Sequence, residues 1–155
     1  MDPKHLRLYI VRPALESIGM HSPAAENLVL GTAAQESKFR WVRQHGNGPA
    51  LGLFQMEPAT HGDIWSSYLR YKPTLGTRIR KAIQIGILSR PEADRLMWDF
   101  RYAAIMCRVH YRRVKDPLPD EHDVWAMGHY WKDFYNTHHG RGTVEEFVDS
   151  YALVK

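Results

Sequence analysis

Apolar residues at helical spacing constrain this chain more than any other feature. Side chains that recur every three or four residues fall on one face of an α-helix. Three such stripes are Leu6, Ile10, Ala14 and Ile18; Leu96, Phe100, Ala103 and Cys107; and Val124, Met127, Trp131 and Phe134. No run alternates apolar and polar residues with the β-branched side chains typical of a long strand. The sequence therefore predicts a mainly α-helical fold with at most a small β element.

The beginnings and ends of the first helices can also be predicted. Pro13 lies inside the first stripe and indicates a kink or two shorter helices, and Gly19 is a suitable stop. Ser22-Pro23 predicts an N-cap followed by proline at the first helical position. The helix that follows brings Glu36 to its C-terminal end, where the helix dipole disfavours a negative charge. A purely structural design would avoid a carboxylate there, so its position favours a functional role.

Later parts of the chain carry further boundary signals. Residues 43–52 hold three glycines and a proline and are predicted to form a loop. Pro58 is expected to open a short helix through Trp65, and residues 77–87 are consistent with another helix. Ser89 with Glu92 three residues later is the pattern of a capping box, which predicts the start of the longest helix, ended by Pro117. Thr143 and Glu146 predict a second capping box before a last short helix.

Length and composition favour one soluble domain over residues 1–155, long enough to bury a core. The first five residues, Met1 to His5, are not followed by the apolar run of a signal peptide. No stretch approaches the roughly 20 apolar residues that span a bilayer, so no transmembrane segment and no membrane insertion are expected. The single cysteine, Cys107, excludes an intramolecular disulfide and is predicted to be a buried core residue.

The formal net charge is +4, from 21 basic and 17 acidic residues, which suits a polyanionic neighbour such as DNA, an anionic membrane surface or a bacterial envelope. The densest basic cluster is Arg108, Arg112, Arg113 and Lys115. This cluster is either a solvated helix end or the face of a nucleic-acid-binding module. Because no recognised DNA-binding motif accompanies it, no nucleic-acid partner is expected.

Histidines and tryptophans are abundant. The nine histidines include the pair His138-His139, but none has a recognised zinc spacing, so neither a metal nor a cofactor is expected. The tryptophans are Trp41, Trp65, Trp98, Trp125 and Trp131. At least three are predicted to be core residues because they fall on helix faces. Trp41, beside the glycine loop, is the best candidate for stacking on a sugar.

Glu36 and Gln55 can be linked to one kind of chemistry. Cleavage of a glycosidic bond needs a protonated carboxylic acid near the leaving oxygen, and apolar neighbours can raise the pKa of a glutamate enough to supply it. The glycines of the loop allow the backbone to approach a bulky substrate closely. Gln55, at the end of that loop, offers both a donor and an acceptor for a sugar hydroxyl or an acetamide.

Four blocks occur along the chain in a fixed order: Glu36-Ser37, Gly52-Leu53-Phe54-Gln55-Met56, Pro58-Ala59-Thr60 and Tyr135-Asn136. This order resembles the family of soluble lytic transglycosylases and goose-type lysozymes. That family shows Glu-Ser, a glycine-containing loop, Gly-Leu-Met-Gln, often Pro-Ala-Thr, and a late Tyr-Asn. The resemblance covers roughly residues 22–150, and the sequence around Gln55–His61 and Tyr135–Thr137 is similar to that of bacteriophage-encoded members.

The chain departs from the family pattern at two places. Phe54 stands where the family usually has methionine, a hydrophobic exchange that can reshape a sugar subsite. Thr137-His138 follow Tyr135-Asn136, where the family usually continues Ala-Gly. The second departure affects the backbone that places Tyr135 and Asn136.

The resemblance implies a lysozyme-like fold of the goose-type branch and a role for each matching residue. Glu36 would protonate the oxygen that links N-acetylmuramic acid to N-acetylglucosamine in peptidoglycan. Ser37 and Gln55 would position the substrate, Tyr135 would lie near Glu36, and Asn136 would shape the turn or contact sugar. The substrate's own acetamide would replace a second carboxylate. Glu36 would then act as a base on the muramyl C6 hydroxyl, giving a 1,6-anhydro product.

A second carboxylate would change the outcome to hydrolysis. An inverting hydrolase places it roughly 6.5–9.5 Å from the acid, with water between them. The candidates are Glu57 and Asp63. Glu57 lies where goose-type lysozymes tend to carry an aspartate, but it also suits the first turn of a helix, and Asp63 suits a surface position. The sequence therefore favours a lytic transglycosylase, with the hydrolase as the alternative.

The expected partners follow from the same resemblance: the glycan strands of peptidoglycan and, for a bacteriophage protein, tail or baseplate proteins. Without an export signal, the protein would reside in the host cytoplasm before release or be carried in the virion, and would act on the bacterial cell wall. A catalytically silent phage structural protein of the same fold is a further alternative. The intact Glu36, Ser37 and Gln55 argue against it.

Overall fold

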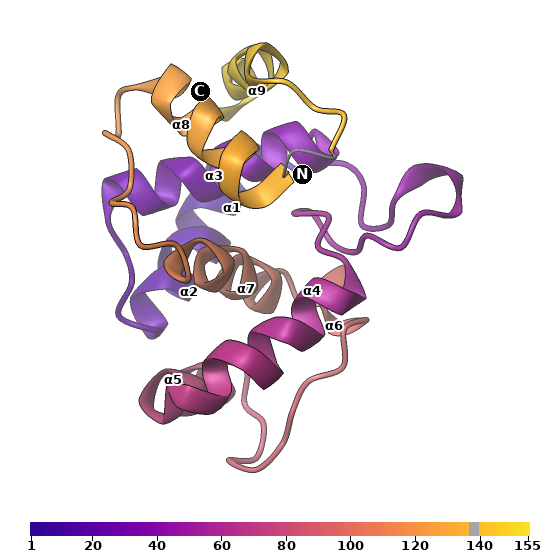
Figure 1. Cartoon of the computed structure of the whole chain (residues 1–155), viewed down its shortest axis with the longest axis vertical. Coiled ribbons are helices and arrows are strands. Elements are labelled where there is room, and N and C mark those ends of the chain that lie inside the picture. The colour runs from indigo at the N-terminus through magenta and orange to yellow at the C-terminus, as the bar shows by residue number, and fades with distance from the viewer. Residues whose placement is uncertain (137–139) are drawn as a thin grey trace.

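The computed structural model describes residues 1–136 and 140–155, and 64% of the chain is helical (Figure 1). The α-helices are α1 (Pro3–Leu6), α2 (Arg12–Ser17), α3 (Pro23–Ser37), α4 (Pro58–Asp63), α5 (Pro73–Ala82), α6 (Arg95–Trp98), α7 (Phe100–Arg112), α8 (Val124–Trp131) and α9 (Val144–Tyr151). Among the described residues there is no strand, only the isolated bridges Arg43–Leu51 and Leu51–Met56. The prediction of a mainly helical chain is confirmed.

Short π-helical and 3₁₀ segments extend or join these helices. The π-helical segments are η1 (Arg7–Val11), η3 (Ile64–Tyr68) and η5 (Lys132–Asn136), and the 3₁₀ turns are η2 (His45–Asn47), η4 (Leu69–Tyr71) and η6 (Ala152–Val154). The N-terminal run from Pro3 to Ser17 stays helical throughout. Pro13 is the second residue of α2, the helix that follows η1 directly. The proline is therefore accommodated by a changed hydrogen-bond pattern rather than by two separate helices.

Helix α3 crosses the upper half of the molecule in Figure 1 and packs against α7, α8 and α9. Ser22 caps it by accepting a hydrogen bond from the Ala25 backbone N–H at 3.0 Å, which confirms the predicted N-terminus. Its residues from Leu28 to Ala34 are all buried, so apolar side chains surround the helix on every side. Cys107 on α7 is fully buried, which confirms its predicted place in the core.

An ionic cluster joins α3 to the N-terminal helices. The carboxylate of Glu26, which is buried, accepts hydrogen bonds from Arg7 at 2.7 Å and from Arg12 at 2.9 Å, and pairs with His21 at 2.8 Å. Burial alone would raise the pKa of Glu26, but these three partners outweigh it and hold the pKa at about 2. The N-terminal half of α3 is therefore anchored electrostatically, and its C-terminal end lies free of this cluster.

Two helix boundaries differ from the sequence prediction. The helix expected over 77–87 is α5, which begins at Pro73, a favourable first position, and ends at Ala82 before Gln84 adopts a left-handed φ of 58°. The capping box predicted at Ser89 and Glu92 does not form, because the chain there is a turn. The backbone instead breaks at Asp99, whose side chain accepts from the Tyr102 N–H at 2.9 Å and caps α7.

The other end of the chain follows the prediction. Thr143 and Glu146 form both hydrogen bonds of a capping box at the start of α9. Pro58 opens α4, which continues into η3 through Trp65 as expected. None of the described helices combines the length and the apolar character that crossing a membrane requires.

Candidate active-site cleft

A cleft of about 800 Å³ lies where the C-terminal end of α3 meets the loop that follows it. Its walls come from α3, from the loop between α3 and α4, from α7, and from the segment that runs from α8 to α9. Six residues singled out in the sequence line it: Glu36, Trp41, Gln55, Glu57, Tyr135 and Asn136. Residues that are up to 100 positions apart thus share one cavity.

Glu36 is the penultimate residue of α3 and is partly buried in this cleft. The indole N–H of Trp131 donates a hydrogen bond to Glu36 Oε1 at 2.8 Å. Because an indole nitrogen can only donate, Oε1 must act as the acceptor. When Glu36 is protonated, its hydrogen therefore belongs on Oε2, the oxygen that Trp131 does not bind.

Burial raises the pKa of Glu36 to about 7. The hydrogen bond from Trp131 and the charge of Lys38 both act in the opposite direction, and they only partly offset the loss of water around the carboxyl group. A glutamate with such a pKa exchanges a proton near neutral pH. It can therefore serve both as a general acid and as a general base.

The loop that carries Gln55 turns back on itself. Gly52 has a φ of 77°, and the side-chain amide of Gln55 donates to the Gly52 carbonyl oxygen at 2.8 Å. Two bridges, from Leu51 to Arg43 and to Met56, close the loop. This arrangement fixes the amide nitrogen of Gln55 within the loop and leaves its carbonyl oxygen as the group that can accept from a ligand.

Tyr135 attaches this loop to the opposite wall. Its hydroxyl donates to the Phe54 carbonyl oxygen at 2.7 Å, and its ring meets that of His110 edge to face, with 5.0 Å between centroids. Burial raises the pKa of Tyr135 well above its usual range and lowers that of His110 to about 4. Both side chains are therefore neutral at pH 7, and Tyr135 positions the loop rather than exchanging a proton.

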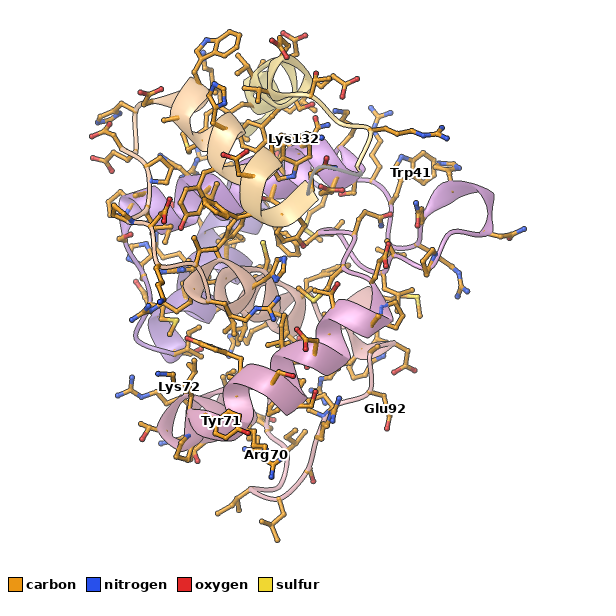
Figure 2. The ribbon with its side chains drawn as sticks, in the orientation of Figure 1. Trp41, Arg70, Tyr71, Lys72, Glu92 and Lys132 are labelled. Carbon is orange, nitrogen blue, oxygen red and sulfur yellow. The ribbon has the colours of Figure 1, made fainter. Side chains whose placement is uncertain are left out.

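Asn136 ends the π-helical segment η5, and π-helical turns are frequent at functional sites. Lys132 donates from Nζ to Asn136 Oδ1 at 2.7 Å and to the Gly140 carbonyl oxygen at 2.8 Å, so it contacts both Asn136 and Gly140. Figure 2 labels Lys132 on the helical body and Trp41 on the loop that projects beside it. Thr137, His138 and His139 lie outside the described residues.

Two predicted site residues do not line the cleft. Ser37 is only 1% exposed, and its hydroxyl donates to the Ala33 carbonyl oxygen at 3.1 Å, so it stabilises the helix end rather than offering a contact to a ligand. Asp63 is exposed on α4 and accepts from Arg113 at 2.8 Å. Of the two candidate second carboxylates, only Glu57 shares the cavity with Glu36.

Sequence reasoning missed several cleft residues. Trp131 belongs to the predicted core stripe of α8, yet it is also the hydrogen-bond donor to Glu36. Its spacing of four residues from Tyr135 places the two on one helical face, a signal that could have connected them. Glu146 also lines the cleft although it serves the capping box of α9. His110 gave no sequence signal of its own.

The prediction that at least three tryptophans lie in the core was wrong. Only Trp65 and Trp131 are buried, whereas Trp98 and Trp125 are more than half exposed, because each lies on the solvent face of its helix. Trp41 is 45% exposed, lines the cleft and contacts the His45 ring edge to face. It therefore offers an aromatic face to a ligand in the cleft.

The described residues, which do not include His138 and His139, contain no candidate metal site. In them, no three or more histidine, cysteine, aspartate or glutamate side chains lie together in a way that suits a metal ion. Comparisons with protein-family models, with curated proteins and with solved structures find no match for this chain.

Proposed function

We propose that this chain is a peptidoglycan-degrading glycosidase with a lysozyme-like fold, and that it acts as a lytic transglycosylase on the bond between N-acetylmuramic acid and N-acetylglucosamine. The observation that carries the proposal is the Glu36 carboxyl group, held by Trp131 in a large cleft with a pKa of about 7. Gln55 and Trp41 in the same cleft supply the amide and the aromatic face that a sugar chain requires.

In the proposed reaction, the proton on Glu36 Oε2 moves to the glycosidic oxygen as the bond to the muramyl C1 breaks. The acetamide of the substrate attacks C1 and forms a cyclic intermediate. Glu36, now ionised, then takes the proton from the muramyl C6 hydroxyl, whose oxygen attacks C1 and releases the acetamide. A pKa near 7 suits both steps, because the same group must give up and regain a proton at one pH.

Hydrolysis is the second candidate, and the position of Glu57 favours it. Glu57 is exposed, lines the cleft and precedes α4 without a side-chain capping bond, so its carboxylate can receive a proton from water. An inverting hydrolase would use it as the base. Such an enzyme would yield reducing ends instead of 1,6-anhydro ends.

The test is digestion of purified peptidoglycan, with the products analysed by mass spectrometry. We expect 1,6-anhydro muropeptides from the wild-type protein and from Glu57→Gln. Reducing-end products that disappear in Glu57→Gln would support the hydrolase instead. Glu36→Gln should lower the rate roughly 10²- to 10⁴-fold, while Glu16→Gln, on an exposed position of α2, should not change it. Cleavage that survives Glu36→Gln, or a wild-type protein that cleaves nothing, would overturn the proposal.

A further inference from the structure

The charged side chains of residues 64–91 are all basic. The segment contains six of them and no aspartate or glutamate: Arg70, Lys72, Arg78, Arg80, Lys81 and Arg90. Because the whole chain has a formal charge of +4, the remaining residues together have a net charge of −2. The net positive charge of this protein therefore comes from this one segment.

These charges are not neutralised within the protein. Among the described residues, no ion pair involves any of the six. Five of them are exposed, and Arg80 is partly so. Arg80 and Arg90 donate hydrogen bonds to the backbone carbonyl oxygens of Ser89 and Gly62, which position the guanidinium groups without cancelling their charge.

The same segment presents aliphatic side chains to water. Residues 86–89 form a β-turn in which the Ser89 N–H donates to the Gly86 carbonyl oxygen at 2.9 Å, with Ile87 and Leu88 at its two central positions. Such positions usually hold glycine, proline, asparagine, aspartate or serine. Leu88 is 96% exposed and Ile87 72%, and with Tyr71 at 70% they are the three most exposed large hydrophobic side chains described.

The turn and the residues just before it are held in place by neighbouring helices. Arg80 on α5 donates to the Ser89 carbonyl oxygen at 2.7 Å, and Arg95 on α6 donates to that of Ile83 at 2.9 Å. Arg80 also stacks on Trp65, with 4.9 Å from its guanidinium carbon to the ring centroid. The exposed aliphatic pair is therefore presented by an anchored loop, which lowers the entropic cost of placing it against a partner.

The basic and apolar groups gather at one end of the molecule. In Figure 1, α5 and the loop that follows it form the lower end, and Figure 2 places Arg70, Tyr71 and Lys72 at that end too. None of the described residues that line the cleft belongs to 64–91. A partner at this end would therefore leave the cleft open.

We propose that residues 64–91 dock the protein on an anionic phospholipid surface. The six basic side chains would contact headgroup phosphates, and Ile87 and Leu88 would enter the boundary between headgroups and acyl chains. A soluble polyanion would satisfy the charges but leave the aliphatic pair in water. A lipid surface satisfies both, which is why the apolar turn favours it. This inference does not depend on the function proposed for the cleft.

The test is co-sedimentation of the full chain with vesicles of phosphatidylglycerol and phosphatidylethanolamine, compared with vesicles of phosphatidylcholine alone. We expect binding to the anionic vesicles only, weakened by added salt. The double substitution Ile87→Ser with Leu88→Ser should reduce affinity about tenfold, and Lys72→Gln with Lys81→Gln about tenfold or more. Glu36→Gln should bind as the wild type does, so a failure of the cleft assignment is distinguishable from a failure here.

Matched controls use residues outside the segment. Leu153→Ser removes an exposed aliphatic side chain elsewhere, and Arg112→Gln with Lys115→Gln removes two exposed charges, so neither change should alter binding. Equal binding to neutral vesicles, or full binding by the serine double variant, would overturn the proposal. So would double-stranded DNA that competes fully with the vesicles and binds the serine variant undiminished, because the segment would then be a site for a soluble polyanion.

Discussion

Glu36 lies one residue before the end of α3, where two effects favour its neutral form. The carbonyl groups at a helix C-terminus repel a negative charge, and the surrounding side chains remove much of the water that would stabilise a carboxylate. Burial is the larger cause, and the pKa reaches about 7. The opposing hydrogen bond from Trp131 makes the pKa adjustable by a single substitution.

Trp131→Phe is expected to raise the pKa of Glu36 further, by about 0.5–1 unit. The substitution removes a donor that binds the ionised carboxylate, and water replaces it only in part. Titration of the Glu36 carboxyl carbon by NMR measures this directly and does not require activity. Trp65→Phe is the control, because the Trp65 indole donates to Tyr102 and not to Glu36. A fall in the pKa of the Trp131→Phe protein would contradict this account.

Two features favour glycine at position 52: its positive φ, and the close approach of the Leu96 backbone. A Cβ there would lie 2.3 Å from the Leu96 carbonyl oxygen, whereas a Cβ on Gly46 would meet nothing within 4 Å. Both glycines have a left-handed φ, 70° at Gly46 and 77° at Gly52, so alanine is strained at either position. The comparison of the two isolates the clash with Leu96.

We therefore expect Gly46→Ala to lower the free energy of unfolding by about 1 kcal/mol and Gly52→Ala by about 3 kcal/mol. Urea denaturation, monitored by circular dichroism, compares the two variants. Equal losses would show that the loop before Gln55 can move away from Leu96, and that the glycine is needed for its φ alone.

At the level of whole elements, stripes and caps predicted much of the fold. Ser22, Pro58 and Thr143 each mark a helix start correctly, because an N-cap or a first-turn proline acts through its immediate neighbours. Ser89 and Glu92 have the same local pattern, yet no helix begins there. The turn at 86–89 is instead held by Arg80, and Arg95 holds Ile83 just before it, contacts that no local pattern reveals.

The candidate site was predictable in part for the same reason. Glu36 and Gln55 stand out because their chemistry and spacing are local. That Trp131 donates to Glu36 depends on how α8 packs against α3, a contact across 95 positions. Ser37 and Asp63 share the local pattern of site residues, but the packing turns one into the helix and pairs the other with Arg113.

The start of α7 offers a direct test of this correction. Asp99→Ala should lower the free energy of unfolding by about 1–2 kcal/mol, because it removes the cap on the Tyr102 N–H and the ion pair with Arg95. Asp99→Asn, which keeps the capping oxygen but not the charge that pairs with Arg95, should recover the part of that loss due to the cap. Ser89→Ala, at the cap predicted from sequence, should change stability by less than about 0.5 kcal/mol. Thermal denaturation of the three proteins gives the comparison, and a larger effect at Ser89 would refute the assignment.

At the scale of the molecule, the pH dependence of stability is set by buried groups whose pKa values shift in opposite directions on folding. Burial lowers the pKa of His61 and of His110 from 6.5 to about 4, so the unfolded chain binds their protons first and acid favours unfolding. Glu36 acts in the opposite direction, since the folded state binds its proton between pH 7 and 4.5. Glu26 adds stability above pH 4.5 that is lost as the pH falls toward 2. From pH 7 to 4.5, the two histidines outweigh Glu36, and stability should fall.

His61→Gln should flatten this fall. Trp65 donates to the Tyr102 hydroxyl at 2.8 Å, so the single hydrogen of that hydroxyl is directed to His61 Nε2 at 2.6 Å, and the imidazole must stay neutral to accept it. Its protonation in the unfolded chain then contributes a loss of up to about 3 kcal/mol between pH 6.5 and 4. Glutamine keeps an accepting oxygen and does not titrate. Urea denaturation at pH 7, 6, 5 and 4.5 gives the free energy of unfolding as a function of pH. Its slope should be shallower for His61→Gln than for the wild type or for the control His122→Gln, which changes an exposed histidine. Equal slopes would mean that His61 is protonated within the fold.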